Sequence, residues 1–98
     1  IDYAQKSLLY EKTEEAGELI GFAYLKTQQV DLAINQFKSL IERYPQNSNH
    51  YVNLATSYII KLNFVEAGKT MNRLLEVKPD AKNEDNVKKY LILAFFFK

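Results

Sequence analysis

The sequence predicts an all-α fold, an α-solenoid in which antiparallel helix pairs are stacked in a row. Two observations support this fold class. Apolar residues recur at intervals of three and four, the spacing of one face of a helix, along most of the 98 residues. One arrangement of them also occurs twice, 34 residues apart. A fixed period of that length indicates two copies of one supersecondary unit.

The two copies are residues 17–45 and residues 51–79. The first copy is marked by Gly17, Ile20, Gly21, Tyr24, Ala33, Phe37, Leu40 and Pro45. The equivalent residues of the second copy are Tyr51, Leu54, Ala55, Tyr58, Ala67, Met71, Leu74 and Pro79. Each residue of the first set lies 34 positions before its equivalent in the second.

Side-chain size gives each copy the character of a helix pair. We expect Gly21 to face Ala33, and Ala55 to face Ala67, so that the two helix axes of a pair can approach to about 8–10 Å. The large residues of each copy, the tyrosine together with Phe37 or its equivalent methionine, should fill the space between one unit and the next. The closing proline cannot continue a helix and should end the second helix of each unit.

The order of residue types resembles the tetratricopeptide repeat, whose signature is a large residue, a Leu-Gly pair, a tyrosine, an alanine, an aromatic residue and a closing proline. The first copy matches it with Ile20-Gly21, Tyr24, Ala33, Phe37 and Pro45. The second copy matches it with Tyr51, Leu54-Ala55, Tyr58, Ala67, Met71 and Pro79. Gly17 in place of the large residue and Met71 in place of the aromatic residue are mild departures. The resemblance implies a first repeat at residues 14–47 and a second at residues 48–81.

Helical spacing places the helices of repeat one at about residues 14–27 and 31–44, and those of repeat two at about residues 48–62 and 64–77. Thr13 and either Asn47 or Ser48 should cap the first helix of each repeat. Gly68 lies inside a predicted helix, and a close approach by a neighbouring helix would explain it.

Flanking helices are predicted at residues 2–12 and 83–97. The first of them is interpreted as the tail of a preceding unit or as a cap on repeat one. We expect the 98 residues to form a single helical domain, and we expect it to be part of a longer protein, because the chain begins with Ile1 and already in a predicted helix.

Composition argues against several functional classes. The formal net charge of +1 gives no general attraction to nucleic acid or to an anionic membrane. Without cysteine there is no disulfide, no thiolate chemistry and no zinc-ligand spacing. Since the sequence also has no glycine-rich phosphate loop and no nucleophile–base arrangement, we predict no enzyme activity, no cofactor and no metal site. The compartment stays open between the cytoplasm and the bacterial cell envelope or periplasm.

Two polar features have a simple interpretation. His50, the only histidine, is predicted to be a surface residue near a loop. Glu14, Glu15 and Glu18 are predicted to be a solvated first helical turn, where acidic residues interact favourably with the helix dipole. A contact with a basic partner is the alternative for these three residues.

The resemblance to tetratricopeptide proteins implies a function in protein–protein interaction. Stacked units curve and create a concave face, which in this family is lined by the outward side of the first helix of each pair. On this chain the predicted groove for a partner peptide or helix is lined by Leu19, Phe22, Leu25, Lys26, Val52, Asn53, Thr56, Ile59 and Ile60. These side chains could instead pack on the helix at residues 2–12, which would leave no open groove.

One use of the family is disfavoured by these residues. Members that bind chaperone tails hold a carboxylate with lysine, asparagine and arginine side chains. Only Asn53 falls on such a position, whereas Glu18, Phe22, Asn83 and Val87 occupy the others.

The last predicted helix suggests an alternative function. Its stripe of Val87, Tyr90, Leu91, Ala94 and Phe95 should pack on repeat two. Its other side is also apolar, with Ile92, Leu93, Phe96 and Phe97, and a helix that is apolar all round is usually buried on more than one side. We expect either the next helix of a longer chain or a docking partner to cover it, and a homo-oligomer is possible. The run from Tyr90 to Phe97 is far shorter than the roughly 20 residues that a membrane span requires.

Overall fold

The structure, a computed structural model, describes residues 13–97, with side chains described as far as Phe96. The helix predicted at residues 2–12 and the side chain of Phe97 lie outside the described residues. The regular elements are α2 (Glu14–Lys26), α3 (Val30–Arg43), α4 (Ser48–Ile60), α5 (Phe64–Val77), the 3₁₀ helix η1 (Pro79–Asn83) and α6 (Asp85–Phe97). The regular structure of residues 13–97 is therefore entirely helical, and the all-α prediction is confirmed.

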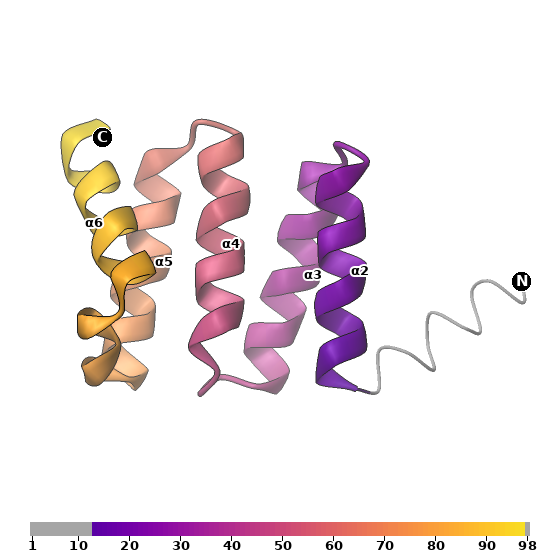
Figure 1. Cartoon of the computed structure of the whole chain (residues 1–98), viewed down its shortest axis with the longest axis horizontal. Helices are drawn as coiled ribbons and strands as arrows, with labels where there is room; N and C mark the ends of the chain where they lie inside the picture. The colour runs from indigo at the N-terminus through magenta and orange to yellow at the C-terminus, as the bar shows by residue number, and fades with distance from the viewer. Residues whose placement is uncertain (1–12, 98) are drawn as a thin grey trace, which may run out of the picture.

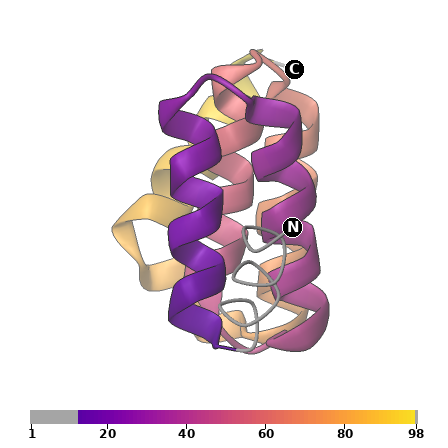
Figure 2. The same cartoon turned by 90° about the vertical axis from the view of Figure 1, so that its right-hand side faces the viewer.

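The helices follow one another in space as they do in sequence. Each α-helix packs on the next, from α2 on α3 through to α5 on α6. Figure 1 shows the row from α2 at one end to α6 at the other. The view turned by 90° shows two layers, with α2, α4 and α6 in one and α3 and α5 in the other (Figure 2). We call the first the A layer and the second the B layer.

The two hairpins close with the same turn. Gln28 and Leu62, which are 34 residues apart, both adopt a left-handed conformation, with φ of 62° and 60°. The amide of the following residue donates to a carbonyl five residues earlier in both turns, at 2.8 Å from Gln29 to Tyr24 and at 2.8 Å from Asn63 to Tyr58. This pattern is a common way to end a helix. The sequence repeat is thus a repeat of backbone geometry.

Helix starts follow the predicted caps. The Thr13 hydroxyl accepts a hydrogen bond from the Ala16 amide at 3.1 Å, and the Asn47 side chain accepts one from the Asn49 amide at 3.0 Å. Asn63 caps α5 in the same way. The helices of both repeats begin and end within two residues of the predicted bounds. Of the two candidates for the cap of α4, Asn47 is the one observed.

Glycines make room for large side chains within repeat one. A Cβ added to Gly21 would lie 2.5 Å from the ring of Phe37. A Cβ added to Gly17 would lie 2.7 Å from Cδ2 of Leu40. The close approach at Gly21 is therefore to Phe37, and the prediction that Gly21 faces Ala33 is wrong. Gly17, which departs from the family signature, leaves the space that Leu40 fills.

The core runs through both repeats and into α6. Its fully buried members include Ala33, Phe37, Leu40, Ala55, Ala67, Met71, Leu74 and Val87. Ala23, expected to face inward, is exposed, whereas its equivalent Ser57 is fully buried. The difference arises because α4 lies between two helix pairs and α2 borders only one within residues 13–97.

The connection into α6 departs from the 34-residue period. Residues 78–84 separate α5 from α6, whereas residues 44–47 suffice between α3 and α4, and the longer connection contains η1. The last helix accordingly begins at Asp85, two residues later than predicted. Its more buried positions are Val87, Tyr90, Leu91 and Ala94. These match Tyr51, Leu54, Ala55 and Tyr58 of α4 at an interval of 36 residues.

The shift of two residues changes the side of α6 that faces solvent. Phe95, predicted to pack on repeat two, is 69% exposed. The other members of the predicted stripe are buried or half-buried. Gly68 explains how closely α6 approaches, because a Cβ added there would lie 2.7 Å from the Cβ of Ala94. The predicted reason for this glycine is confirmed.

Candidate partner-binding face

The outward side of the A layer in repeats one and two holds the predicted groove residues. Leu19, Ile60 and Phe22 are 68%, 53% and 39% exposed, and Lys26 is exposed as well. The remaining predicted groove residues are half-buried, namely Leu25, Val52, Asn53, Thr56 and Ile59. We call these nine residues the groove face.

Helical spacing explains why these residues share one side of their helices. Leu19, Phe22 and Lys26 recur at intervals of three and four along α2, and so do Asn53, Thr56 and Ile60 along α4. The two sets are equivalent in the 34-residue repeat. Because α2 and α4 lie in the same layer (Figures 1 and 2), the two sets present adjacent stripes of one surface. The most exposed members of these stripes are apolar.

Two members of the groove face have partners inside the chain. The hydroxyl oxygen of Thr56 lies 2.6 Å from the hydroxyl of Tyr90 on α6 and donates to the carbonyl of Val52 at 2.8 Å. The ring of Phe22 packs on the ring of Phe37, with centroids 5.8 Å apart. Thr56 and Phe22 therefore contribute to the packing of the solenoid. Leu19 and Ile60 are the members with most of their surface available to a ligand.

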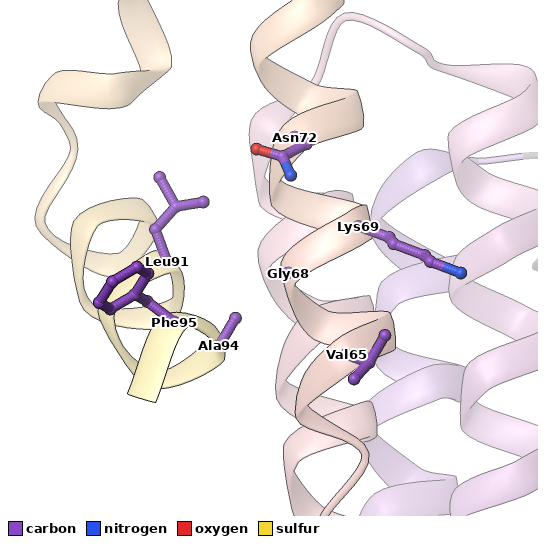
Figure 3. Close-up of a pocket in the computed structure, with 7 residues that line it drawn as sticks. All are labelled: Val65, Gly68, Lys69, Asn72, Leu91, Ala94 and Phe95. Atoms are coloured by element: carbon purple, nitrogen blue, oxygen red, sulfur yellow. The ribbon is translucent and has the colours of Figure 1, made fainter. Parts of the chain in front are cut away.

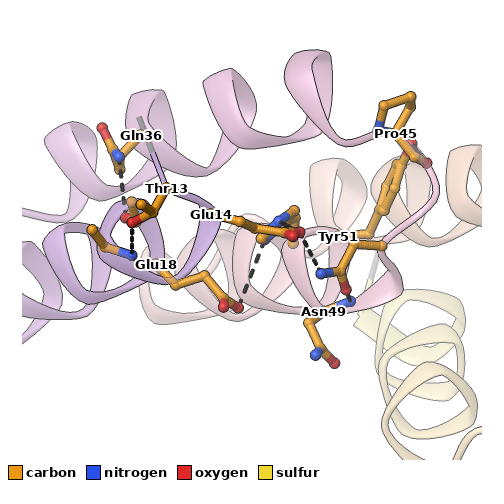
Figure 4. Close-up of polar contacts among 11 residues, drawn as sticks. Thr13, Glu14, Glu18, Gln36, Pro45, Asn49 and Tyr51 are labelled. Carbon is orange, nitrogen blue, oxygen red and sulfur yellow. Dashed lines mark hydrogen bonds and ion pairs between the residues drawn. The ribbon is translucent and has the colours of Figure 1, made fainter. Parts of the chain in front are cut away.

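A buried polar cluster joins the start of α2 to the start of α4 (Figure 4). His50 is completely buried, and its Nε2 atom lies 2.6 Å from a carboxylate oxygen of Glu14. Its Nδ1 atom lies 3.7 Å from a carboxylate oxygen of Glu18. The Asn47 amide donates to the same oxygen of Glu14. The prediction that His50 is a surface residue is wrong, and Glu14 and Glu18 face the neighbouring repeat.

The cluster perturbs one of its carboxylates. The hydrogen bond from Asn47 is the main reason that the pKa of Glu14 is lowered, and His50 acts in the same direction against an opposing effect of desolvation. Sequence analysis missed the cluster because His50 and Glu14 lie 36 residues apart. Their proximity depends on how two parallel helices of the same layer are offset. That offset is a property of the packing and leaves no signature in the spacing of apolar residues.

A shallow groove also lies between α5 and α6 (Figure 3), with a volume of about 270 Å³. It is lined by Val65, Gly68, Lys69, Asn72, Leu91, Ala94 and Phe95. Gly68 forms its floor where the two helices come closest. This groove contains none of the nine residues of the groove face.

Comparison with protein families supports the resemblance that the residue pattern indicated. A family model described as tetratricopeptide repeat matches residues 15–47, which is the first of the two copies. The second copy has the same helix bounds shifted by 34 residues and the same turn geometry. The chain is a tetratricopeptide-repeat protein. Comparison with curated proteins gave no match.

Membership of the tetratricopeptide family has general consequences for function. Tetratricopeptide repeats are protein–protein interaction modules, and the family is generally non-catalytic. Within residues 13–97 no group of three or more histidine, cysteine, aspartate or glutamate residues is arranged to hold a metal ion. None of the helices described there is both long enough and apolar enough to cross a membrane.

The shifted register makes α6 a third A-layer helix of this tetratricopeptide stack. At an interval of 36 residues, Lys89, Ile92 and Phe96 take the places of Asn53, Thr56 and Ile60 on α4. The earlier assignment of Asn83 and Val87 to the carboxylate-binding positions of the third helix is wrong. Asn83 belongs to η1, and Val87 is completely buried.

Proposed function

We propose that this tetratricopeptide chain is an interaction module that binds a peptide or helix of a partner protein through its groove face. One observation carries the proposal: Leu19 and Ile60, two large apolar side chains at the surface of adjacent A-layer helices, keep more than half of their area exposed. Exposed apolar surface that is continuous across neighbouring elements is typical of interaction sites. An amphipathic helix can bury such a stripe with anchors spaced three or four residues apart.

Energetics favours an apolar partner stripe over a charged one. Complete burial of a leucine or isoleucine side chain contributes about 1.5–3 kcal/mol, and Leu19 and Ile60 have most of that burial still to gain. Lys26 and the carboxylate of Glu15 lie at the exposed edge of the same stripe on α2. They are suited to a polar rim around an apolar centre.

The test is a peptide selection with matched variants. A displayed library of random peptides is selected on the immobilised chain, and the recovered peptides are then measured against Leu19→Glu and Ile60→Glu. Each variant should weaken binding at least about tenfold, because a carboxylate placed in an apolar contact is desolvated without a partner. Leu32→Glu is the control, since Leu32 is 43% exposed and belongs to α3 in the other layer.

The outcome separates the groove face from the rest of the surface. Circular dichroism should show that all three variants keep the helical content of the parent chain. Selected peptides that bind the two groove variants as tightly as the parent chain, or that lose binding only with Leu32→Glu, contradict the proposal.

A second candidate is self-association through α6. Ile92, Phe95 and Phe96 are 55%, 69% and 72% exposed, and the rings of Phe95 and Phe96 contact each other at a centroid distance of 5.6 Å. Leu93, which was also predicted to belong to this surface, is half-buried. Sedimentation equilibrium should then show a concentration-dependent dimer that the double variant Ile92→Ser, Phe96→Ser dissociates. A monomer at all concentrations excludes this candidate.

A further inference from the structure

The junction between the two repeats contains an ionisable group that the proposed function does not use. His50 is the third residue of α4 and is completely buried. Two carboxylates of α2 approach it, Glu14 at Nε2 and Glu18 at Nδ1. Its Nδ1 atom is buried without a hydrogen-bond partner. Such an atom in a native structure requires an explanation.

The charge state of the ring supplies that explanation. A neutral imidazole has one donor nitrogen and one acceptor nitrogen. If Nε2 carries the proton, the lone pair of Nδ1 faces the Glu18 carboxylate; if Nδ1 carries it, the lone pair of Nε2 faces a Glu14 oxygen at 2.6 Å. Both neutral forms place a lone pair against a carboxylate oxygen. Only the imidazolium offers a donor to each of the two carboxylates.

The other groups around the ring act less directly. The ring of Tyr44, at the end of α3, lies at a centroid distance of 6.0 Å with an angle of 51° between the planes. Asn47 donates its amide to Glu14 and not to the imidazole. The start of α4 itself disfavours a positive charge, because the positive end of the helix dipole lies there. Glu14 and Glu18 are the charged groups that oppose this effect.

We propose that His50 is a pH-sensitive latch between repeats one and two. The protonated ring holds the start of α2 against the start of α4 through Glu14 and Glu18. Histidine changes charge between about pH 5 and 8, so a rise in pH through this range removes one of the two donors and loosens the junction. Because Leu19 and Phe22 belong to α2 and Ile60 belongs to α4, the junction also controls how the two stripes of the groove face are placed relative to each other.

The next junction along the chain offers an internal comparison. There the Ser48 hydroxyl lies 3.3 Å from a carboxylate oxygen of Glu84. Glu84 follows Ser48 by 36 residues, as His50 follows Glu14. The two contacts are equivalent in the repeat, but the second contains no histidine. The effect of pH between 5.5 and 8 should therefore be confined to the junction between α2 and α4.

The direction of the pH effect follows from linkage. A proton bound more tightly in the folded chain than in the unfolded chain stabilises the fold at low pH, and this stabilisation is lost as the pH rises. Glu14 acts oppositely, because its lowered pKa gives stability that is lost as the pH falls below the ordinary value of 4.5. A scan from pH 5.5 to pH 8 therefore separates the contribution of His50 from that of Glu14.

The first test is the melting temperature of the parent chain, His50→Gln and Ser48→Ala over this range. The parent chain and Ser48→Ala should melt about 4 °C or more lower at pH 8 than at pH 5.5. The His50→Gln profile should be flat. Parallel profiles for the parent chain and His50→Gln overturn the proposal, and so does a melting temperature of the parent chain that rises with pH.

A second measurement does not depend on the folding of His50→Gln. The imidazole carbon-bound protons of the single histidine report its titration directly by NMR. Glu18→Gln should lower the midpoint of this titration, because it removes the charge next to Nδ1. Amide exchange, corrected for its intrinsic pH dependence, should accelerate about fivefold in α2 between pH 5.5 and pH 8 and stay unchanged in α5. An unchanged midpoint in Glu18→Gln, or equal acceleration in both helices, overturns the proposal.

Discussion

Two residues in the hairpin turns show what a repeat requires of single positions. Gln28 and Leu62 are left-handed although neither is glycine. A side chain costs roughly 1–2 kcal/mol in this conformation. The hydrogen bonds that close the turns, from Gln29 to Tyr24 and from Asn63 to Tyr58, hold both residues there. The strain is therefore imposed by the tight hairpin and occurs once in each repeat.

Leu62→Gly should stabilise the chain by about 0.5–1 kcal/mol, because the relief of left-handed strain exceeds the added entropy of the unfolded glycine. Leu62 is 74% exposed, so little apolar burial is lost. Chemical denaturation measures the change in the free energy of unfolding. Lys61→Gly is the matched control, since Lys61 has φ of −83° and gains no relief, and it should destabilise. A Leu62→Gly variant less stable than Lys61→Gly would contradict this account.

At the scale of the helices, sequence periodicity predicted most of the fold. Apolar spacing, two capping residues and two prolines placed α2, α3, α4 and α5 within two residues of their observed bounds. The period failed at α6 because the connection through η1 is longer, so that the buried face recurs after 36 residues. A 34-residue period cannot report such a shift, because it assumes that every connection has the same length.

The candidate site was less accessible to sequence analysis than the helices. The exposure of Leu19 and Ile60 agrees with the predicted groove, because outward positions follow from helical spacing alone. The Thr56–Tyr90 contact and the cluster around His50 join residues of different repeats. Their geometry depends on the offset and tilt of neighbouring helices, which a single sequence does not encode in its spacing.

At the scale of the whole molecule, stability depends on how α6 closes the row of helices. Each tetratricopeptide unit buries its apolar side only against a neighbour, and α6 covers α5 at one end of the row (Figure 1). Gly68 sets the distance between these two helices, with only 2.7 Å from an added Cβ to the Cβ of Ala94. The equivalent residue of repeat one is Ile34. The small residue at this position is thus matched to α6.

Gly68→Ala should lower the free energy of unfolding by about 1–3 kcal/mol, since overpacking outweighs the better helix propensity of alanine. Ala94→Gly should also destabilise, by about 1 kcal/mol, through helix propensity. The double variant should cost at least about 0.5 kcal/mol less than the sum of the two single changes, because it restores the space between α5 and α6. Urea unfolding of the four chains measures this coupling. Strict additivity, or a stabilised Gly68→Ala, would mean that contact with Ala94 does not determine the position of α6.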